Sequence, residues 1–129
     1  MTLSRYSPYA LSLLRVIAGL IFMEHGTQKL LGFPLGDHAA PALMSLGGAA
    51  GIIELVGGAL IVLGLFTRVA AFICSGEMAF AYWMVHAQHG PFPVNNGGDA
   101  AILYCFVFLF IVFAGPGLVS LDAAAGRAR

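Results

Sequence analysis

Residues 47–66, GGAAGIIELVGGALIVLGLF, form an apolar run that carries a single charged side chain, Glu54. A helix that crosses a hydrocarbon core about 30 Å thick needs about 20 mainly apolar residues. Strands of a membrane barrel would alternate polar and apolar residues, and this run does not. The run therefore predicts a transmembrane helix.

Three further apolar segments have the composition of membrane helices. We expect them at about 9–31, 69–88 and 100–114. Glycine and proline separate the segments, as at Gly90-Pro91 and Gly115-Pro116-Gly117, where a helix cannot easily continue. The four helices use most of the chain. The sequence thus predicts a single domain over residues 1–129 of the all-α class, an integral membrane four-helix bundle.

The composition supports a lipid environment. Of the 129 residues, 60% are hydrophobic and 9% are charged, whereas ordinary soluble domains carry about 25% charged residues. Such a chain cannot build a water-facing surface. The composition argues against a disordered protein, a basic nucleic-acid binder and a disulfide-stapled secreted protein. We expect the lipid bilayer, and no nucleic acid, as the surroundings of this protein.

The distribution of basic residues predicts the orientation. If the helices alternate in direction, five arginines fall on one side of the membrane and Lys29 on the other. The positive-inside rule then puts both termini in the cytoplasm and the 32–46 and 89–98 loops outside. Arg15 interrupts the first apolar run, so we expect a retained helix rather than a cleaved signal peptide. Arg15 and Arg68 are expected to reach the cytoplasmic headgroups.

Glu54 lies on a stripe of small residues. At 100° per residue, Gly47, Gly51, Glu54 and Gly58 share one face of the helix. Small residues let helices approach closely in lipid, so Glu54 should point into the bundle. An ionised group at this depth costs a few kcal/mol and needs a partner, a proton or a function. A purely structural hydrogen bond to a neighbouring helix stays open.

The other helices bring titratable groups to the same outer half, and the sequence predicts that these groups converge on one recess. Each also has a structural alternative, as a helix cap, a snorkelling side chain or an interfacial histidine. Our candidates for proton transfer or ligand hydrogen bonding are Glu54, His25 and His86, and our candidates for ligand contact are Glu24, Lys29, Asp99 and Tyr104.

Glu77 is expected to lie outside this recess. Along an ideal helix it points about 180° away from His86. We interpret it as a protonated packing residue or a contact between subunits.

No motif for a resident cofactor is visible. The sequence has no GxGxxG after a strand, no CxxCH and no cysteine cluster for an iron–sulfur centre. A b-type haem between His25 and His86, or a metal on the carboxylates, is a minor alternative, and we expect no metal. Cys74 and Cys105 differ in depth by roughly a turn, which favours packing over a disulfide.

The order of short motifs resembles the DoxX family of bacterial membrane proteins over nearly the whole chain. The matching pieces are Leu14-Arg15-Val16, His25-Gly26, Lys29-Leu30, Gly51 to Glu54, Gly57-Gly58, Gly64 to Arg68, Val85-His86, Gly90-Pro91-Phe92, Gly98-Asp99, Tyr104, Gly115-Pro116-Gly117 and Ser120-Leu121-Asp122. The resemblance implies a multi-pass bundle in a bacterial inner membrane. It also implies a relation to the DoxD subunit of thiosulfate:quinone oxidoreductase.

Taken together, the polar cluster and the resemblance predict a membrane-embedded subunit of a redox complex. A quinone would be its substrate, with electrons from a protein partner or a reduced sulfur compound. Two alternatives stay open. One is a scaffold or assembly factor that docks other helices, or further copies of itself, on the glycine stripe. The other is a small proton-coupled transporter.

Overall fold

A computed structural model describes residues 2–36, 41 and 43–127 of the chain. In these residues every regular element is helical, which confirms the all-α prediction. Parts of the predicted 32–46 loop, and Arg129, lie outside the described residues. The elements are η1 (Leu3–Tyr6), α1 (Ser7–Leu31), α2 (Leu46–Leu63), α3 (Thr67–Ala81), the π-helical turn η2 (Tyr82–His86), η3 (Ala87–His89), α4 (Pro93–Asn96), α5 (Asp99–Ala114) and α6 (Leu121–Ala124).

Three helical stretches are long and apolar enough to cross a membrane: Leu3–Leu31, Leu46–Leu63 and Thr67–His89. The fourth apolar helix, α5, has 16 residues and is therefore about 24 Å long at 1.5 Å per residue. The helix α2 ends at Leu63, three residues before the predicted end, because Gly64 adopts a left-handed conformation with φ of 67°. The next helix consequently begins at Thr67 rather than 69.

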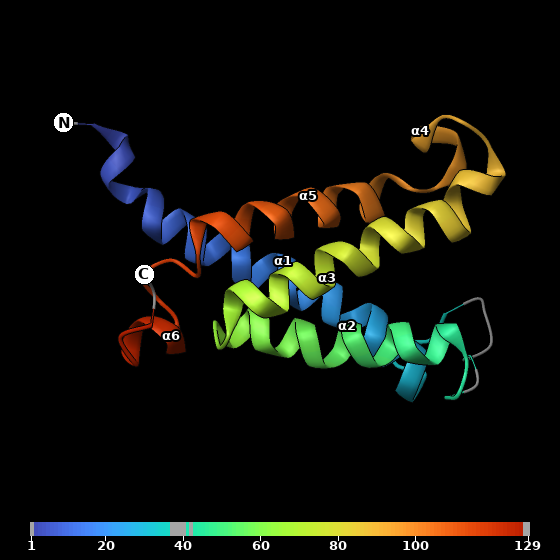
Figure 1. Ribbon diagram of the computed structural model, residues 1–129, viewed down its shortest axis with the longest axis horizontal. Helices are drawn as coiled ribbons and strands as arrows, with labels where there is room; N and C mark the ends of the chain where they lie inside the picture. The colour runs from blue at the N-terminus through green and yellow to red at the C-terminus, as the bar shows by residue number, and fades with distance from the viewer. Residues whose placement is uncertain (1, 37–40, 42, 128–129) are drawn as a thin grey trace.

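The helices form two close pairs. The helix α1 packs along α2, α5 packs along α3, and the contact between α2 and α3 joins the pairs (Figure 1). The short helices η1 and α6 lie at one end of the bundle, which we call the η1–α6 end. The short helix α4 lies at the opposite end. The core between the pairs contains the fully buried side chains of Phe22, Ile61, Cys74, Phe108 and Ile111.

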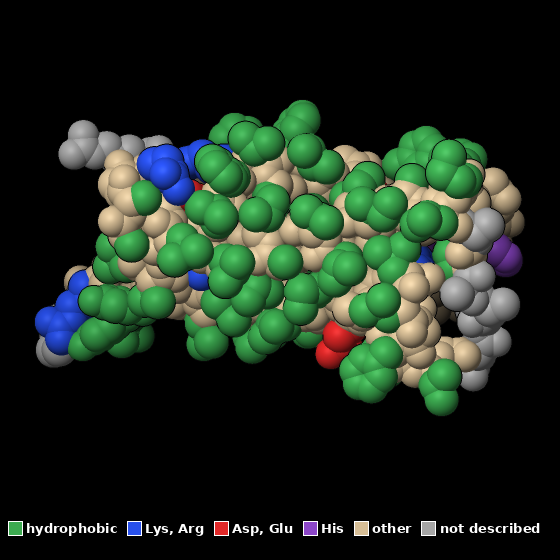
Figure 2. Space-filling view, turned by 90° about the horizontal axis from the view of Figure 1, so that it is seen from below, with side chains coloured by type: hydrophobic (Ala, Val, Ile, Leu, Met, Phe, Trp, Pro, Cys, Tyr) green, Lys and Arg blue, Asp and Glu red, His purple; other side chains and the backbone are tan. Residues whose placement is uncertain are grey.

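The outer surface of the bundle is hydrophobic. Large apolar side chains such as Leu13, Phe72, Trp83 and Phe113 are mostly exposed. Figure 2 shows one face covered mainly by hydrophobic groups, with the Lys and Arg side chains gathered mostly near the η1–α6 end. Such a surface is stable against acyl chains and not against water. The chain is therefore a multi-pass membrane protein.

Glycines set the distance between α1 and α2. A Cβ atom added to Gly26 would lie 2.4 Å from the backbone nitrogen of Leu55, and one added to Gly58 would lie 2.9 Å from Cβ of Met23. The two helix backbones therefore touch directly. Gly51 and Gly58 of the predicted stripe are buried in this contact. The stripe is used within the chain and is not the free docking surface that a scaffold would need.

Arg15 corrects one prediction, because its side chain is 1% exposed and does not reach the headgroups. Its guanidinium donates to the carbonyl oxygens of Pro116, Val119 (2.8 Å) and Val62 (3.4 Å). The carbonyls of Pro116 and Val119 belong to the segment that follows α5. Arg15 thus ties α1 to α2 and to the end of the chain.

Arg68 also binds carbonyl groups. Its Nη1 donates to Val112 at 2.6 Å and to Phe113 at 2.8 Å, in the last turn of α5. The last carbonyls of a helix have no partner within it and carry the negative end of the helix dipole, so a guanidinium there is favourable. Arg68 therefore caps α5.

Asp122 caps the start of α3. Its carboxylate accepts hydrogen bonds from the backbone nitrogens of Phe66 (3.0 Å) and Thr67 (2.9 Å) and from the Thr67 hydroxyl (2.8 Å). Arg127 lies 3.5 Å from the same carboxylate. Burial on its own would raise the pKa of Asp122, but the hydrogen bonds from Thr67, Phe66 and Arg127 lower it below its ordinary value of 3.8.

We expect Gly26→Ala to destabilise the bundle, because its methyl group would overlap the backbone of Leu55. A comparable overpacking costs about 1–3 kcal/mol. Gly76→Ala is the matched control, since a Cβ at Gly76 meets nothing within 4 Å and alanine favours helix by about 1 kcal/mol over glycine. Thermal unfolding in detergent, followed by helical circular dichroism, measures both. Equal melting temperatures would contradict the direct contact between α1 and α2.

We expect Asp122→Asn to lower the free energy of unfolding at pH 7 by about 1 kcal/mol, because a charge-assisted cap is lost. The folded state lowers the pKa of Asp122. The ionised Asp122 carboxylate therefore stabilises the fold above pH 3.8, and this stabilisation disappears as the pH falls further. The difference between wild type and variant should therefore shrink in acid. Asp99→Asn, at an exposed carboxylate, is the control and should change stability by less than about 0.5 kcal/mol. A difference that stays constant with pH would be inconsistent with this role.

Candidate functional site

A partly buried ion pair lies at the middle of α2. Nζ of Lys29 is 2.6 Å from Oε1 of Glu54, and the Glu54 side chain is 1% exposed while that of Lys29 is 33% exposed. Side chains on a helix lean toward its N-terminus. In α1 this direction leads from Lys29 back toward the middle of the bundle, and in α2 it leads from Glu54 toward the α4 end. The two side chains therefore point toward each other, and Lys29 does not snorkel outward.

Glu77 joins this pair, contrary to the sequence prediction. Glu54 lies nine residues before the end of α2 and Glu77 ten residues after the start of α3, so both are about 14 Å from the turn that connects them. One helical turn closer to the α2–α3 turn, Gly57 faces Cys74. A Cβ atom added to Gly57 would lie 2.5 Å from Sγ of Cys74. Glu77 therefore lies across from Glu54, and its carboxyl interacts electrostatically with both Glu54 and Lys29.

Two carboxylate oxygens of this cluster are unpartnered. Oε2 of Glu54 and Oε2 of Glu77 are buried and have no hydrogen-bond donor among the described residues. Two carboxylates cannot hydrogen-bond each other unless one of them carries a proton. We call Lys29, Glu54 and Glu77 the buried triad.

The placement of Glu77 outside the recess depended on His86 as the marker of that recess. The structure puts His86 against Asn96 and away from Glu54, so a position opposite His86 does not separate Glu77 from Glu54. The interpretation of Glu77 as a protonated residue stays a prediction. A signal for the position of Glu77 was available in the sequence. In a tight hairpin of helices, residues equally far from the turn face each other, and Glu54 and Glu77 have this relation across Gly64–Phe66.

An aromatic cluster lies beside the triad. The rings of Phe22, Tyr104 and Phe108 pack with centroids 4.9–5.8 Å apart. The His25 ring meets Tyr104 edge-on at 6.0 Å. Tyr104 interacts electrostatically with both Glu54 and Glu24. His25 is next to Gly26, which touches Leu55, so His25 lies at about the depth of Glu54. Tyr104 of α5 packs against it.

The surface next to His25 is only slightly hollowed. A depression of about 120 Å³ is lined by Glu24, His25, Gln28 and Pro34, and Glu24 and His25 are both exposed. Sites for small molecules usually measure about 300–1,000 Å³. The depression is therefore too small to enclose a ligand.

His86 and Asp99 lie apart from the triad. Nδ1 of His86 is 3.2 Å from the carbonyl oxygen of Asn96, and Asn96 itself donates to the Tyr82 hydroxyl and the Gly90 carbonyl. These contacts fasten the loop around α4 to η2. Asp99 is exposed in the first turn of α5. Within the described part of the chain, no contact links His86 or Asp99 to Glu54.

In the described residues, no group of three or more His, Cys, Asp or Glu side chains is placed so that it could hold a metal ion. Cys74 and Cys105 are free thiols. Cys74 packs against α2 near Gly57, and Cys105 lies 3.6 Å from the hydroxyl of Ser75.

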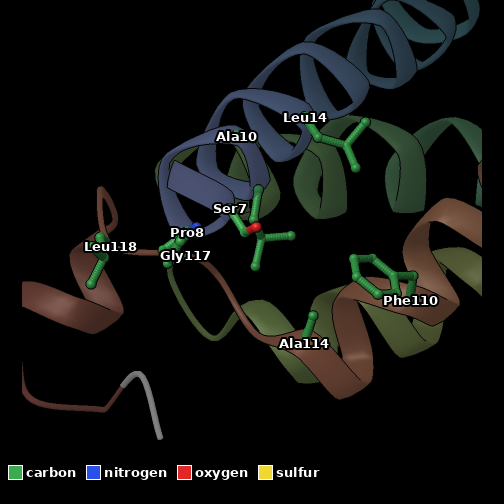
Figure 3. Close-up of a pocket in the computed structure, with 9 residues that line it drawn as sticks. Ser7, Pro8, Ala10, Leu14, Phe110, Ala114, Gly117 and Leu118 are labelled. Atoms are coloured by element: carbon green, nitrogen blue, oxygen red, sulfur yellow. The ribbon is translucent and has the colours of Figure 1, made fainter. Parts of the chain in front are cut away.

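A larger groove lies near the η1–α6 end. It has a volume of about 670 Å³ and runs between the start of α1 and the end of α5 (Figure 3). Apart from the Ser7 hydroxyl, apolar or small residues line it: Pro8, Ala10, Leu11, Leu14, Phe110, Ala114, Gly117 and Leu118. With no titratable side chain, the groove suits hydrocarbon rather than a polar headgroup.

These features define a class: a multi-pass α-helical membrane protein with ionisable side chains buried at mid-depth. The chain belongs to the DoxX family, whose model matches residues 10–87. No solved structure matches it.

Several relatives match over most of their length. An uncharacterized protein of Haemophilus influenzae is 48% identical over 93% of each chain. Inner membrane protein YphA of Escherichia coli is 32% identical over 89% of each chain. A Bacillus subtilis protein named "Putative oxidoreductase CatD" is 33% identical, over 85% of this chain and 82% of its own.

We expect Lys29→Met to destabilise the protein at pH 7, because the buried Glu54 loses its counter-ion and has to take up a proton from solvent instead. Removing one partner of a fully buried pair costs about 3–5 kcal/mol; since Lys29 is one-third exposed, we expect about 1–3 kcal/mol here. Adding Glu54→Gln should restore most of this loss. A double-mutant cycle of thermal unfolding measures the coupling. Additive effects would mean that the two side chains do not interact.

Proposed function

We propose that this protein is the membrane-embedded subunit of a redox complex and that it supplies protons for quinone chemistry. The observation that carries the proposal is the buried Lys29–Glu54 pair, in which one carboxylate oxygen is unpartnered. Ionisable groups inside a membrane are costly and mark proton relays or substrate sites more often than packing contacts. The triad gives this chain such a group at mid-depth.

Quinone reduction fits the residues around the triad. Reducing a quinone to a quinol takes two electrons and two protons, one proton for each carbonyl oxygen. The His25 imidazole and the Tyr104 hydroxyl can donate hydrogen bonds to those oxygens. Glu54 lies behind them and can deliver a proton from the bundle, and oxidation of a quinol would return protons by the same groups.

The electrons must come from outside this chain. Our hypothesis is a protein partner of the complex or a reduced sulfur compound, as the family resemblance suggests. The relative named as an oxidoreductase supports redox chemistry in general terms. By the positive-inside rule, we propose cytoplasmic termini, so that His25 and Glu24 lie near the periplasmic surface.

The boundary between α1 and α5 offers a route for the quinone. The two helices make few contacts with each other, and both His25 with Tyr104 and the apolar groove lie along this boundary. A ring that entered from lipid would meet His25 and Tyr104, and its isoprenoid tail would follow the boundary toward the groove. The small depression at His25 would have to widen when the ring binds.

We expect the protein, purified in mild detergent with its partners, to contain quinone detectable by mass spectrometry. The same preparation should reduce a soluble quinone analogue when supplied with thiosulfate. Glu54→Gln should lower that rate about 100-fold or more, because general acid–base catalysis contributes about 10²–10⁴, while unfolding curves show that the variant still folds. Equal rates for wild type and Glu54→Gln would contradict the proposal, as would a preparation without quinone.

Two histidines provide a matched comparison. His25→Gln should reduce the rate, since His25 faces Tyr104. His89→Gln should leave it unchanged, because His89 is exposed and contacts only the Val85 carbonyl among the described residues. If both variants behave alike, His25 has no direct role. A scaffold would instead keep its partners and show no quinone, and a proton-coupled transporter would move solute in proteoliposomes without an electron donor.

A further inference from the structure

We propose that Glu54 and Glu77 hold one proton between them, and that Lys29 makes the protonated pair electrically neutral. The buried triad is then the proton-binding site of the chain. The inference deepens the proposed function, because it concerns the same site. It does not depend on quinone, since the proton would be held whether or not a quinone is bound.

Geometry favours a proton at this position. Glu54 and Glu77 are equally far from the α2–α3 turn, one turn beyond the close approach of Gly57 and Cys74, and a carboxylate has no hydrogen to donate. Oε2 of each residue is buried and receives no hydrogen bond from any described donor. Glu54 is almost wholly buried, so water cannot readily satisfy it. A proton between the two carboxyls satisfies both oxygens at once.

The charge balance gives the number of protons. With both carboxyls ionised, the triad carries one net negative charge; with one proton it is neutral; with two it carries one net positive charge. A net charge at the middle of a bilayer is costly, and two adjacent carboxylates repel each other. The neutral triad with one proton is therefore the favoured state.

Among the described residues, no further group that faces the triad adds a charge that changes this balance. On α1, Lys29 is the cation that faces Glu54, and Glu24 is an exposed acid that interacts with Tyr104. On α3, the thiol of Cys74 lies beside both glutamates and is uncharged in its ordinary thiol form. On α5, the Tyr104 hydroxyl interacts with Glu54 and is likewise neutral. The proton count thus depends on the triad alone.

Infrared spectroscopy of the whole protein in lipid, without added quinone, tests the proposal. A protonated carboxyl has a C=O stretch that is separate from carboxylate bands and shifts in D₂O. At pH 7 we expect about one such carboxyl per chain in the wild type, none in Glu77→Gln or Glu54→Gln, and about two in Lys29→Met, where a second proton must replace the lost cation. Asp99→Asn, at an exposed acid, should match the wild type.

The glutamate variants should lose the protonated-carboxyl band, whereas Lys29→Met should double it. Misfolding would remove the band and not double it, so the test does not depend on folding alone. The proposal is overturned if the wild type has no protonated carboxyl at pH 7, if the band survives Glu77→Gln, or if Lys29→Met leaves it unchanged. The result also separates the two proposals. A missing band with a slow Glu54→Gln enzyme would leave the quinone role standing, and a band that behaves as expected in a protein without quinone would leave only the proton site.

Discussion

The cost of an ionised group in hydrocarbon is the constraint on which this structure depends. Glu54 is tolerable at mid-depth only because α1 brings Lys29 to it and α3 brings Glu77. Both helices must therefore lie close to α2. Glycines make this possible on the α1 side, where Gly26 lets the backbones touch. The close packing of α1, α2 and α3 and the presence of the triad are thus two aspects of one arrangement.

Charged residues have different roles at the η1–α6 end of the bundle and at its mid-depth. At the η1–α6 end, Arg15, Arg68 and Asp122 bind backbone groups left open by helix ends and by the last segment of the chain. Their roles are structural, because the partners are fixed parts of the fold. At mid-depth the triad keeps two unpartnered oxygens. Among the described residues, these two are the buried carboxylate oxygens that have no hydrogen-bond partner.

Much of the fold follows from apolar length and helical phase, which gave the four main helices and the burial of Glu54. Phase within one helix did not reveal which residues meet across helices. It therefore missed Glu77, whose position depends on the α2–α3 turn, and it left the direction of Lys29 open. Arg15 was expected at the headgroups because its carbonyl partners, at Pro116 and Val119, lie a hundred residues away. Such long-range pairings are set by the tertiary fold.

The short length of α5 has a consequence for the lipid around it. Its 16 residues cover about 24 Å, whereas a typical hydrocarbon core is about 30 Å thick. A bilayer beside a short helix thins to match it. Tyr104 lies five residues from the start of this helix. Thinner lipid at α5 would bring the water boundary closer to Tyr104 than it would be beside a helix of full spanning length.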